Sequence, residues 1–202
     1  MGKRTLYIVR HGQYDSSIAD ADGGDLTELG HEQAELAGQY LAQLPISTVH
    51  CSTMVRARTT ARIIAAALAI DPDEIIASDL LREAVPIIPP RFATHFFDLI
   101  EQDNGFDHDR IHRDRQRADA AYEHYFVPAR PDEADVHDLL VCHGNILRYF
   151  TCRALNVDVS TWANMNIYHC GITSIEIGED GLPRLIAHNE TGHLPPKKIT
   201  EM

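Results

Sequence analysis

The sequence lacks several features that would place the protein in a membrane or outside the cell. Its 202 residues contain no apolar run of the ~18 residues that a membrane-spanning helix needs. The chain enters an apolar, strand-like segment at Thr5, which leaves no room for a signal peptide. The four cysteines form no Cys-x-x-Cys pair of the kind that binds zinc; they are Cys51, Cys142, Cys152 and Cys170. Because most of them lie in or beside apolar runs, we interpret them as buried thiols and expect a cytoplasmic protein without membrane contact.

Positive charge is also scarce. The chain has 18 Lys and Arg against 30 Asp and Glu, which gives a formal net charge of -12. This balance argues against nucleic acid or an anionic membrane as a partner. Any anionic substrate would therefore have to be bound by a local cluster of arginines.

Short apolar segments alternate with segments of helical periodicity along the chain. Strands are expected at residues 5–9, 48–51, 75–78, 139–142, 172–177 and 185–188, and helices from the N-cap Thr27 to Pro45, at 54–69 and at 144–155. This alternation predicts an α/β fold, a three-layer α/β/α sandwich around a mostly parallel sheet with an antiparallel edge near the C-terminus. Residues 1–202 are expected to form a single domain. Residues 80–130, with a Pro-rich stretch and two helical pieces broken near Asn104-Gly105, are expected to form a helical cap.

Reactive or cationic side chains follow three of the predicted strands. Arg10 and His11 follow the first, Arg56 opens the helix after the second, and His143 follows the fourth. Ligands of such sheets bind at these strand ends, and a helix N-terminus favours an anion. Arginine forks suit phosphoryl oxygens, and a neutral imidazole can attack phosphorus. Glu83, in the loop after the third strand, is the candidate carboxylic acid that would protonate the leaving group and later activate water, with no metal or cofactor required.

Five sequence elements occur in order and resemble those of the histidine phosphatase superfamily, also called phosphoglycerate-mutase-like. They are Arg10-His11-Gly12, Leu26-Thr27-Glu28-Leu29-Gly30 with Gln33-Ala34, Ser52 to Arg56-Ala57 with Thr60-Ala61, Leu81-Arg82-Glu83, and His143-Gly144. The resemblance covers nearly the whole chain. It implies that His11 is the nucleophile and Glu83 the acid and base, and that Arg10, Arg56 and His143 hold the phosphate, with His143 also among the catalytic residues.

Three further stretches, at 79–87, 142–149 and 191–200, resemble the mitochondrial serine/threonine protein phosphatases of this superfamily. This implies a phosphorylated protein as substrate, with a small-molecule phosphomonoester as the other option. The N-terminal anchor and multimerisation segment of those proteins are not found here, so their location and their activation by oligomerisation are not expected to carry over. The Trp-Asn and Phe-Thr-Gly-Trp segments of mutases are also missing after Gly12, which makes a mutase the weaker interpretation. The oligomeric state is open, with a homodimer as one option.

Several alternatives remain open at this point. The segment from Cys142 to Arg148 satisfies Cys-x5-Arg, so a cysteine-dependent phosphatase is a rival hypothesis. A phosphate-binding or scaffold protein with an inactive site is another. His108 and His112 share a helical face without an evident third metal ligand, and His95 and His193 are candidates for the entrance of the site. Because no basic stripe is visible, we expect recognition mainly through the phosphate group itself.

Overall fold

The computed structural model describes residues 2–18, 22–89 and 108–201. Six strands form one sheet in the order β3-β2-β4-β1-β5-β6. The strands are β1 (Arg4–Arg10), β2 (Thr48–Ser52), β3 (Ile76–Ser78), β4 (Val136–Cys142), β5 (Ile172–Ile177) and β6 (Pro183–Glu190). The first four pair in parallel, whereas β5 and β6 are antiparallel additions at one edge. The predicted α/β class, with a mostly parallel sheet and an antiparallel edge, is confirmed.

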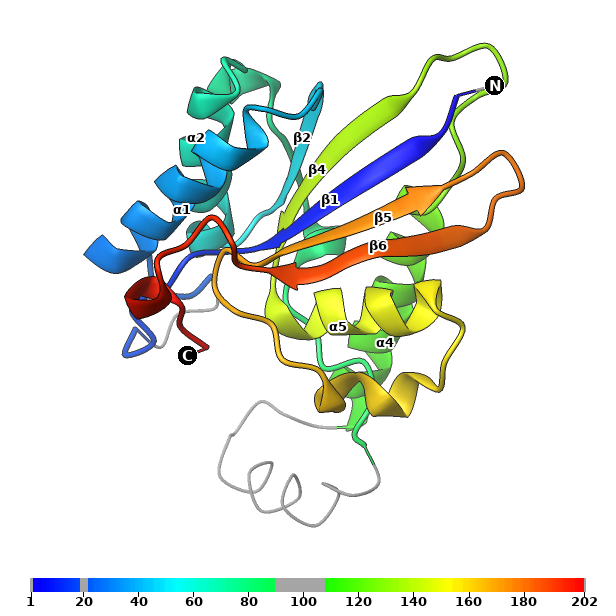
Figure 1. Cartoon of the computed structure of the whole chain (residues 1–202). Coiled ribbons are helices and arrows are strands. Elements are labelled where there is room, and N and C mark those ends of the chain that lie inside the picture. Colours follow the sequence, from blue (N-terminus) through cyan, green and yellow to red (C-terminus); the bar gives the residue numbers. More distant parts are fainter. Residues whose placement is uncertain (1, 19–21, 90–107, 202) are drawn as a thin grey trace.

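Helices cover both faces of this sheet (Figure 1). They are α1 (Glu28–Leu41) and α2 (Val55–Ala67) on one face, and α4 (His108–Tyr125) and α5 (Gly144–Ala154) on the other. Successive side chains of a strand point to opposite faces. Leu6 and Ile8 of β1 accordingly pack into the core under α4 and α5, while Val9 packs under α1 and α2. The strands thus supply two cores, one for each helical layer.

The register of the sheet brings three strand ends together. Arg10, the last residue of β1, pairs with Cys142, the last residue of β4, and Cys51 of β2 pairs with Val141. Helices α2 and α5 begin within a few residues of these ends. Strand ends and helix N-termini therefore meet at one edge of the sheet, as the sequence predicted.

Helix α1 begins where its sequence predicted and ends earlier. Thr27 is the N-cap, and its Oγ1 accepts a hydrogen bond from the Gly30 amide at 3.1 Å. The last helical residue is Leu41, before Pro45 is reached. The amide of Gln43 bonds to the Tyr40 carbonyl, so the final turn tightens and closes the helix without the proline.

The predicted cap falls only partly on described residues. Of its two expected helical pieces, the second is α4, whose buried residues Ala118, Ala121 and Tyr125 belong to the core under the sheet. The first piece, the break near Asn104-Gly105 and His95 lie outside the described residues. The cap remains a prediction.

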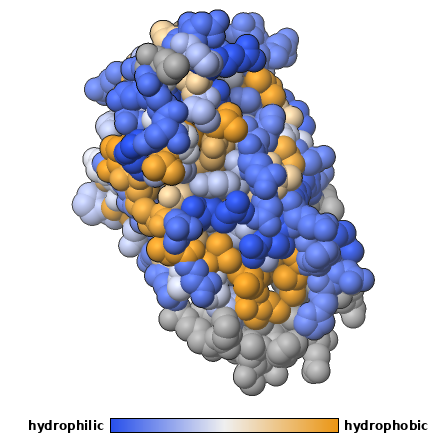
Figure 2. Space-filling view, turned by 90° about the vertical axis from the view of Figure 1, so that its right-hand side faces the viewer, coloured by the Kyte–Doolittle hydropathy of each residue, from blue (hydrophilic) through white to orange (hydrophobic). Residues whose placement is uncertain are grey.

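In the ranges that the structure describes, no helix is long and apolar enough to cross a bilayer. Figure 2 shows one face of the molecule, on which hydrophilic residues predominate and hydrophobic ones gather between them. Short 3-10 turns complete the described elements, at Pro72–Glu74, Asp79–Leu81, Val159–Asn164 and Pro196–Lys198.

Candidate active site

His11 is buried directly after β1, and both of its ring nitrogens are engaged. Nδ1 donates to the Gly12 carbonyl at 2.8 Å, and Nε2 accepts from Arg56 Nε at 3.0 Å. Burial, followed by the proximity of His143 and two arginines, lowers the pKa of His11 well below its usual value. The ring is therefore neutral, with its proton on Nδ1 and its lone pair on Nε2, directed at an arginine.

Two glycines of the sequence motifs allow the His11 loop to approach α1. A Cβ on Gly12 would lie 2.5 Å from the Gly30 carbonyl oxygen, and a Cβ on Gly30 would collide with the Gln13 carbonyl. The Gly12 amide donates to Thr60 Oγ1 at 3.1 Å, which ties the same loop to α2. The loop is thus fixed between two helices, and no larger residue fits at either glycine.

The two predicted arginines flank the histidine. Arg56 lies in the first turn of α2, with its guanidinium 4.5 Å from the centre of the Tyr14 ring. Arg10 is buried, and its Nη1 donates to the carbonyls of Ile167 and Glu201 at 2.6 Å each. Burial lowers the pKa of both guanidiniums from a very high starting value, so both remain cations at neutral pH. Arg58, two residues further along α2, is exposed.

His143 lies behind His11, with the two ring centres 5.0 Å apart. It is fully buried, and its Nε2 is 2.8 Å from Ser52 Oγ, so the serine of one motif holds the histidine of another. Burial and the nearby Arg56 and Arg10 lower the pKa of His143 well below its usual value. Its Nδ1 has no hydrogen-bond partner in the part of the chain that the structure describes.

Glu83 reaches the same edge from the loop after β3. Its Oε1 accepts hydrogen bonds from the amides of Asn145 and Ile146, at 3.2 and 3.3 Å, which belong to the first turn of α5. Burial raises the pKa of Glu83; the hydrogen bond from the Ala84 amide, the charges of Arg56 and Arg10, and the Ile146 amide oppose that rise. The carboxyl group is thus positioned by a helix N-terminus and inclined towards its protonated form.

All these groups except His143 line one pocket of about 340 Å³; its lining residues are Arg10, His11, Tyr14, Arg56, Glu83, Gly144, Asn145, Arg148, Asn166 and Glu201. His143 lies directly behind it. The structure therefore brings together the five residues that the sequence singled out. Tyr14, whose ring meets His11 edge-on at 5.1 Å, was not predicted from the sequence, and Arg148 was considered only for the rival cysteine loop. Tyr14 directly follows the Arg-His-Gly-Gln turn, and that proximity was the signal available.

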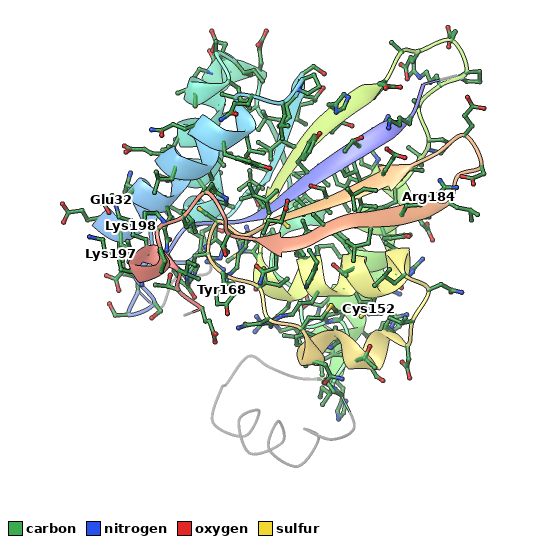
Figure 3. The ribbon with its side chains drawn as sticks, viewed as in Figure 1. Glu32, Cys152, Tyr168, Arg184, Lys197 and Lys198 are labelled. Carbon is green, nitrogen blue, oxygen red and sulfur yellow. The ribbon has the colours of Figure 1, made fainter. Side chains whose placement is uncertain are left out.

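Sequence reasoning also missed the contribution of the C-terminal tail, residues 191–201. His169 is buried 5.7 Å from the His11 ring, and its Nδ1 is 2.9 Å from Thr200 Oγ1. Burial lowers the pKa of His169 to about 3. Gln33, the polar exception in the apolar pattern of α1, is buried and donates to Lys198 O and Thr200 Oγ1, and its Oε1 accepts from the Gln13 amide. Lys198 Nζ also donates to Glu32 Oε2 of α1 at 2.6 Å, and Figure 3 shows these two side chains beside each other.

The rival cysteine loop does not have the required geometry. Cys142 is buried in the core under α4 and α5, and burial strongly raises the pKa of its thiol. The amides of Asn145 and Ile146, which would have to surround a phosphate on that sulfur, bond to Glu83 instead. Arg148 donates to Asn145 Oδ1. A thiolate nucleophile is therefore disfavoured at this position.

The remaining histidine candidates lie elsewhere. His193 donates to the Cys170 carbonyl and stacks on Tyr40 of α1, so it packs the tail and does not line the pocket. His112 bonds to Gln116 along α4. Among the described residues, no group of three or more His, Cys, Asp or Glu side chains could hold a metal ion.

The sequence profile of the histidine phosphatase superfamily (branch 1) matches residues 6–85 and 91–191. The chain belongs to this superfamily. Among solved structures, YhfR of Bacillus stearothermophilus shares the fold with a TM-score of 0.73 and 22% identity, over 95% of this chain and all of that one.

Curated relatives within the histidine phosphatases are named mitochondrial serine/threonine-protein phosphatase Pgam5. The protein of Drosophila ananassae is 36% identical and that of Drosophila melanogaster 35% identical, each over 98% of this chain. The chain spans 66% of the length of these relatives. Because the relatives are named as mitochondrial, they contradict the expected cytoplasmic location, and with it the expectation that a mitochondrial location would not carry over.

Proposed function

We propose that the chain is a phosphatase that hydrolyses phosphomonoesters through a phosphohistidine at His11, without a metal ion. The observation that carries this proposal is the hydrogen bonding of His11. Its proton is held on Nδ1 by the Gly12 carbonyl, and its Nε2 lone pair meets the Arg56 guanidinium, which is also where a phosphoryl group would bind. A neutral imidazole held in this tautomer is a nucleophile, and a cation beside it attracts the substrate.

In the first step, His11 Nε2 forms a bond to phosphorus while the ester P–O bond breaks. The leaving oxygen takes the proton of Glu83, whose raised pKa favours the acid form. Arg10, Arg56 and Arg148 supply positive charge around the phosphoryl oxygens, and the Gly12 carbonyl accepts the Nδ1 hydrogen of the imidazolium. His143, held by Ser52, has one ring nitrogen left for a phosphoryl oxygen.

In the second step, water attacks the phosphohistidine, and the N–P bond breaks. Glu83, now a carboxylate, takes a proton from the water, so inorganic phosphate leaves and the neutral imidazole is restored. The same carboxyl group serves both steps because it lies in the same pocket as His11.

The proposed substrates are proteins phosphorylated on serine or threonine. Support comes from the curated relatives, which are named serine/threonine-protein phosphatases. Small phosphorylated metabolites are the second substrate class. A homodimer remains a prediction, which a measurement of molar mass in solution would test.

The test is hydrolysis of p-nitrophenyl phosphate in the presence of EDTA by wild type, His11→Ala and Cys142→Ser. Wild type and Cys142→Ser should turn over, and His11→Ala should lose at least about a thousandfold in kcat/KM. Acid-labile, base-stable ³²P label on wild type but not on His11→Ala would identify the intermediate.

Two other outcomes would overturn the proposal. Activity that survives in His11→Ala but disappears in Cys142→Ser would establish the cysteine mechanism. Wild type that binds phosphate but is inert towards p-nitrophenyl phosphate and a panel of phosphopeptides and metabolites would establish the binding protein with an inactive site.

A further inference from the structure

A second, larger pocket of about 740 Å³ adjoins the catalytic one, because both are lined by Tyr14, Arg56 and Glu83. We call this larger pocket the arginine pocket, because four further arginines line it: Arg82, Arg110, Arg113 and Arg117. None of these four lines the catalytic pocket around His11.

Three of these arginines lie on one face of α4. Positions 110, 113 and 117 are spaced three and four residues apart, so their side chains leave the helix on the same side. Arg117 holds this face of α4 against the loop that carries Glu83, because its guanidinium donates to the carbonyls of Arg82 and Glu83 at 3.0 and 2.8 Å. Asp114 completes this attachment by accepting from the Val85 amide at 2.9 Å and from Arg117 at 2.6 Å. The helix is thus oriented, and Arg113 and Arg110 line the pocket about one and two turns before Arg117.

The charge of this pocket is opposite to that of the molecule. Among the described residues, the larger pocket is lined by five arginines and two carboxylates, Glu83 and Asp114, in a chain whose formal net charge is -12. Asp114 is paired with Arg117, Glu83 bonds to the start of α5, and Arg82 donates to Asp22 Oδ1 at 2.9 Å. Arg82, from the Glu83 loop, and the arginines of α4 thus combine into a basic surface beside the catalytic pocket.

We propose that the arginine pocket binds acidic side chains next to the phosphorylated residue of a protein substrate, so that acidic phosphopeptides are preferred. This inference rests on the proposed phosphatase function. The pocket exceeds what a second phosphate group needs, and Met54, Val85 and Ile18 contribute apolar surface between the arginines, which suits a peptide. Arginine forks bind carboxylates in the same way as phosphates.

The experiment compares three phosphoserine peptides that differ only in their flanking residues, which are Glu, Gln or Lys. The measured quantity is the ratio of kcat/KM for the acidic peptide to that for the Gln peptide, with p-nitrophenyl phosphate as a reference substrate without flanks. For wild type this ratio should exceed about ten at low salt and shrink towards one as salt is added, mainly through KM. The Lys peptide should be the poorest substrate.

The variant is the pair Arg110→Glu with Arg113→Glu, and its matched control is Arg130→Glu with Arg184→Glu. The control changes the net charge equally at exposed residues that line neither pocket. The acidic preference should disappear or reverse in the first pair and persist in the control. Loss of the preference in both pairs would mean that only net charge matters and would overturn the inference.

Failure of this inference can be told from failure of the proposed function. Wild type that hydrolyses p-nitrophenyl phosphate and all three peptides equally well at low salt is a phosphatase without the subsite. A small bisphosphorylated compound that is hydrolysed far better than the acidic peptide would overturn the choice of a peptide. Wild type that hydrolyses none of these substrates overturns both proposals together.

Discussion

Both ends of the central sheet are hollowed, and the two hollows differ in volume and in the positive charge that lines them. At the amino ends of β1 and β4, a hollow of about 820 Å³ is lined by Gly2, Pro45, Ser47, residues 131–135 and His137. Its charged groups are three carboxylates, those of Asp132, Glu133 and Asp135. At the carboxyl ends of the same strands lies the catalytic pocket of about 340 Å³, with three arginines and a buried histidine.

The difference follows from chain direction and not from size. Parallel strands send the loops that follow them to one edge, and the helices after β2 and β4 present their N-termini there. Arg56 and the amides that hold Glu83 both belong to such helix starts. The larger hollow has no comparable source of positive potential, so volume alone would have indicated the wrong end.

After His11→Ala, the largest expected effect comes from Arg56→Lys, which keeps the charge at the catalytic end but removes the guanidinium fork and its bond to His11. We expect kcat/KM for p-nitrophenyl phosphate to fall by roughly 100-fold to 1,000-fold. The matched control is Arg58→Lys, on the exposed side of the same helix, which should retain wild-type activity. Equal losses in both variants would contradict the assignment of Arg56.

The Glu83→Gln substitution should lower kcat more for substrates with poor leaving groups than for substrates with good ones. An alkyl phosphate such as a phosphoserine peptide needs a proton on its leaving oxygen, so its kcat should fall by about 100-fold, whereas p-nitrophenyl phosphate should lose less in the first step. In wild type, kcat should decline as pH rises through the raised pKa of Glu83, because the acid form is lost. That declining limb should be absent from the pH profile of the variant; a profile identical to wild type would show that Glu83 is not the acid.

Acid should destabilise the protein through the histidines of the catalytic end. The pKa values of His11, His143 and His169 are lowered in the folded state, so below about pH 6.5 the unfolded chain binds more protons and stability falls as pH falls. The slope should approach about 1.4 kcal/mol per pH unit for each histidine, and for His169 it should persist down to about pH 3.

Urea unfolding at pH 7, 6 and 5 measures this effect, and His169→Gln should reduce the slope. The carboxylate of Glu83 acts in the opposite direction, since its raised pKa adds stability that is lost as pH rises. An unfolding free energy that does not change between pH 7 and pH 5 would mean that these histidines are not neutral in the folded protein.

The smallest effect is expected at the acidic end. Asp132→Asn combined with Asp135→Asn removes two charges from exposed side chains there. Activity should not change, and the unfolding free energy should stay within about 0.5 kcal/mol of wild type. The bond that Lys3 N donates to the Asp135 carboxylate can be kept, because the amide oxygen of the substituted side chain is also an acceptor. A marked loss of activity would remove the contrast between the two ends.

The sequence predicted the parts of the site that local chemistry determines. Arg10 and His11 end a strand, Arg56 opens a helix and Gly12 and Gly30 belong to recognisable motifs, so each could be placed by its neighbours in the chain. Whether Arg56 or Arg58 faces inward followed from motif register, and the structure agrees.

The remaining parts depend on packing between distant segments. Arg110 and Arg113 face the pocket only because Arg117 and Asp114 attach α4 to the Glu83 loop. Thr200 reaches His169 and Gln33 across more than 30 and 160 residues of sequence, respectively. No periodicity encodes such contacts, and the motif that contains Gln33 does not reveal which distant residues it bonds. The cellular location was mispredicted for a different reason. Cysteine usage reports on the redox environment and net charge on the surface, and neither specifies the compartment to which a protein is sent.

The tail contacts bear on how the protein should be handled and made. Arg10 donates to the carbonyl of Glu201, which lines the pocket, and Gln33 donates to Lys198 and Thr200 just before it. The pocket around Arg10 is therefore complete only after residues 198–201 have been synthesised and have folded back onto the sheet. A purification tag joined after residue 202 would begin at the mouth of the pocket, whereas Gly2 bonds to Glu133 at the opposite end of the sheet. An affinity tag therefore belongs at the amino terminus.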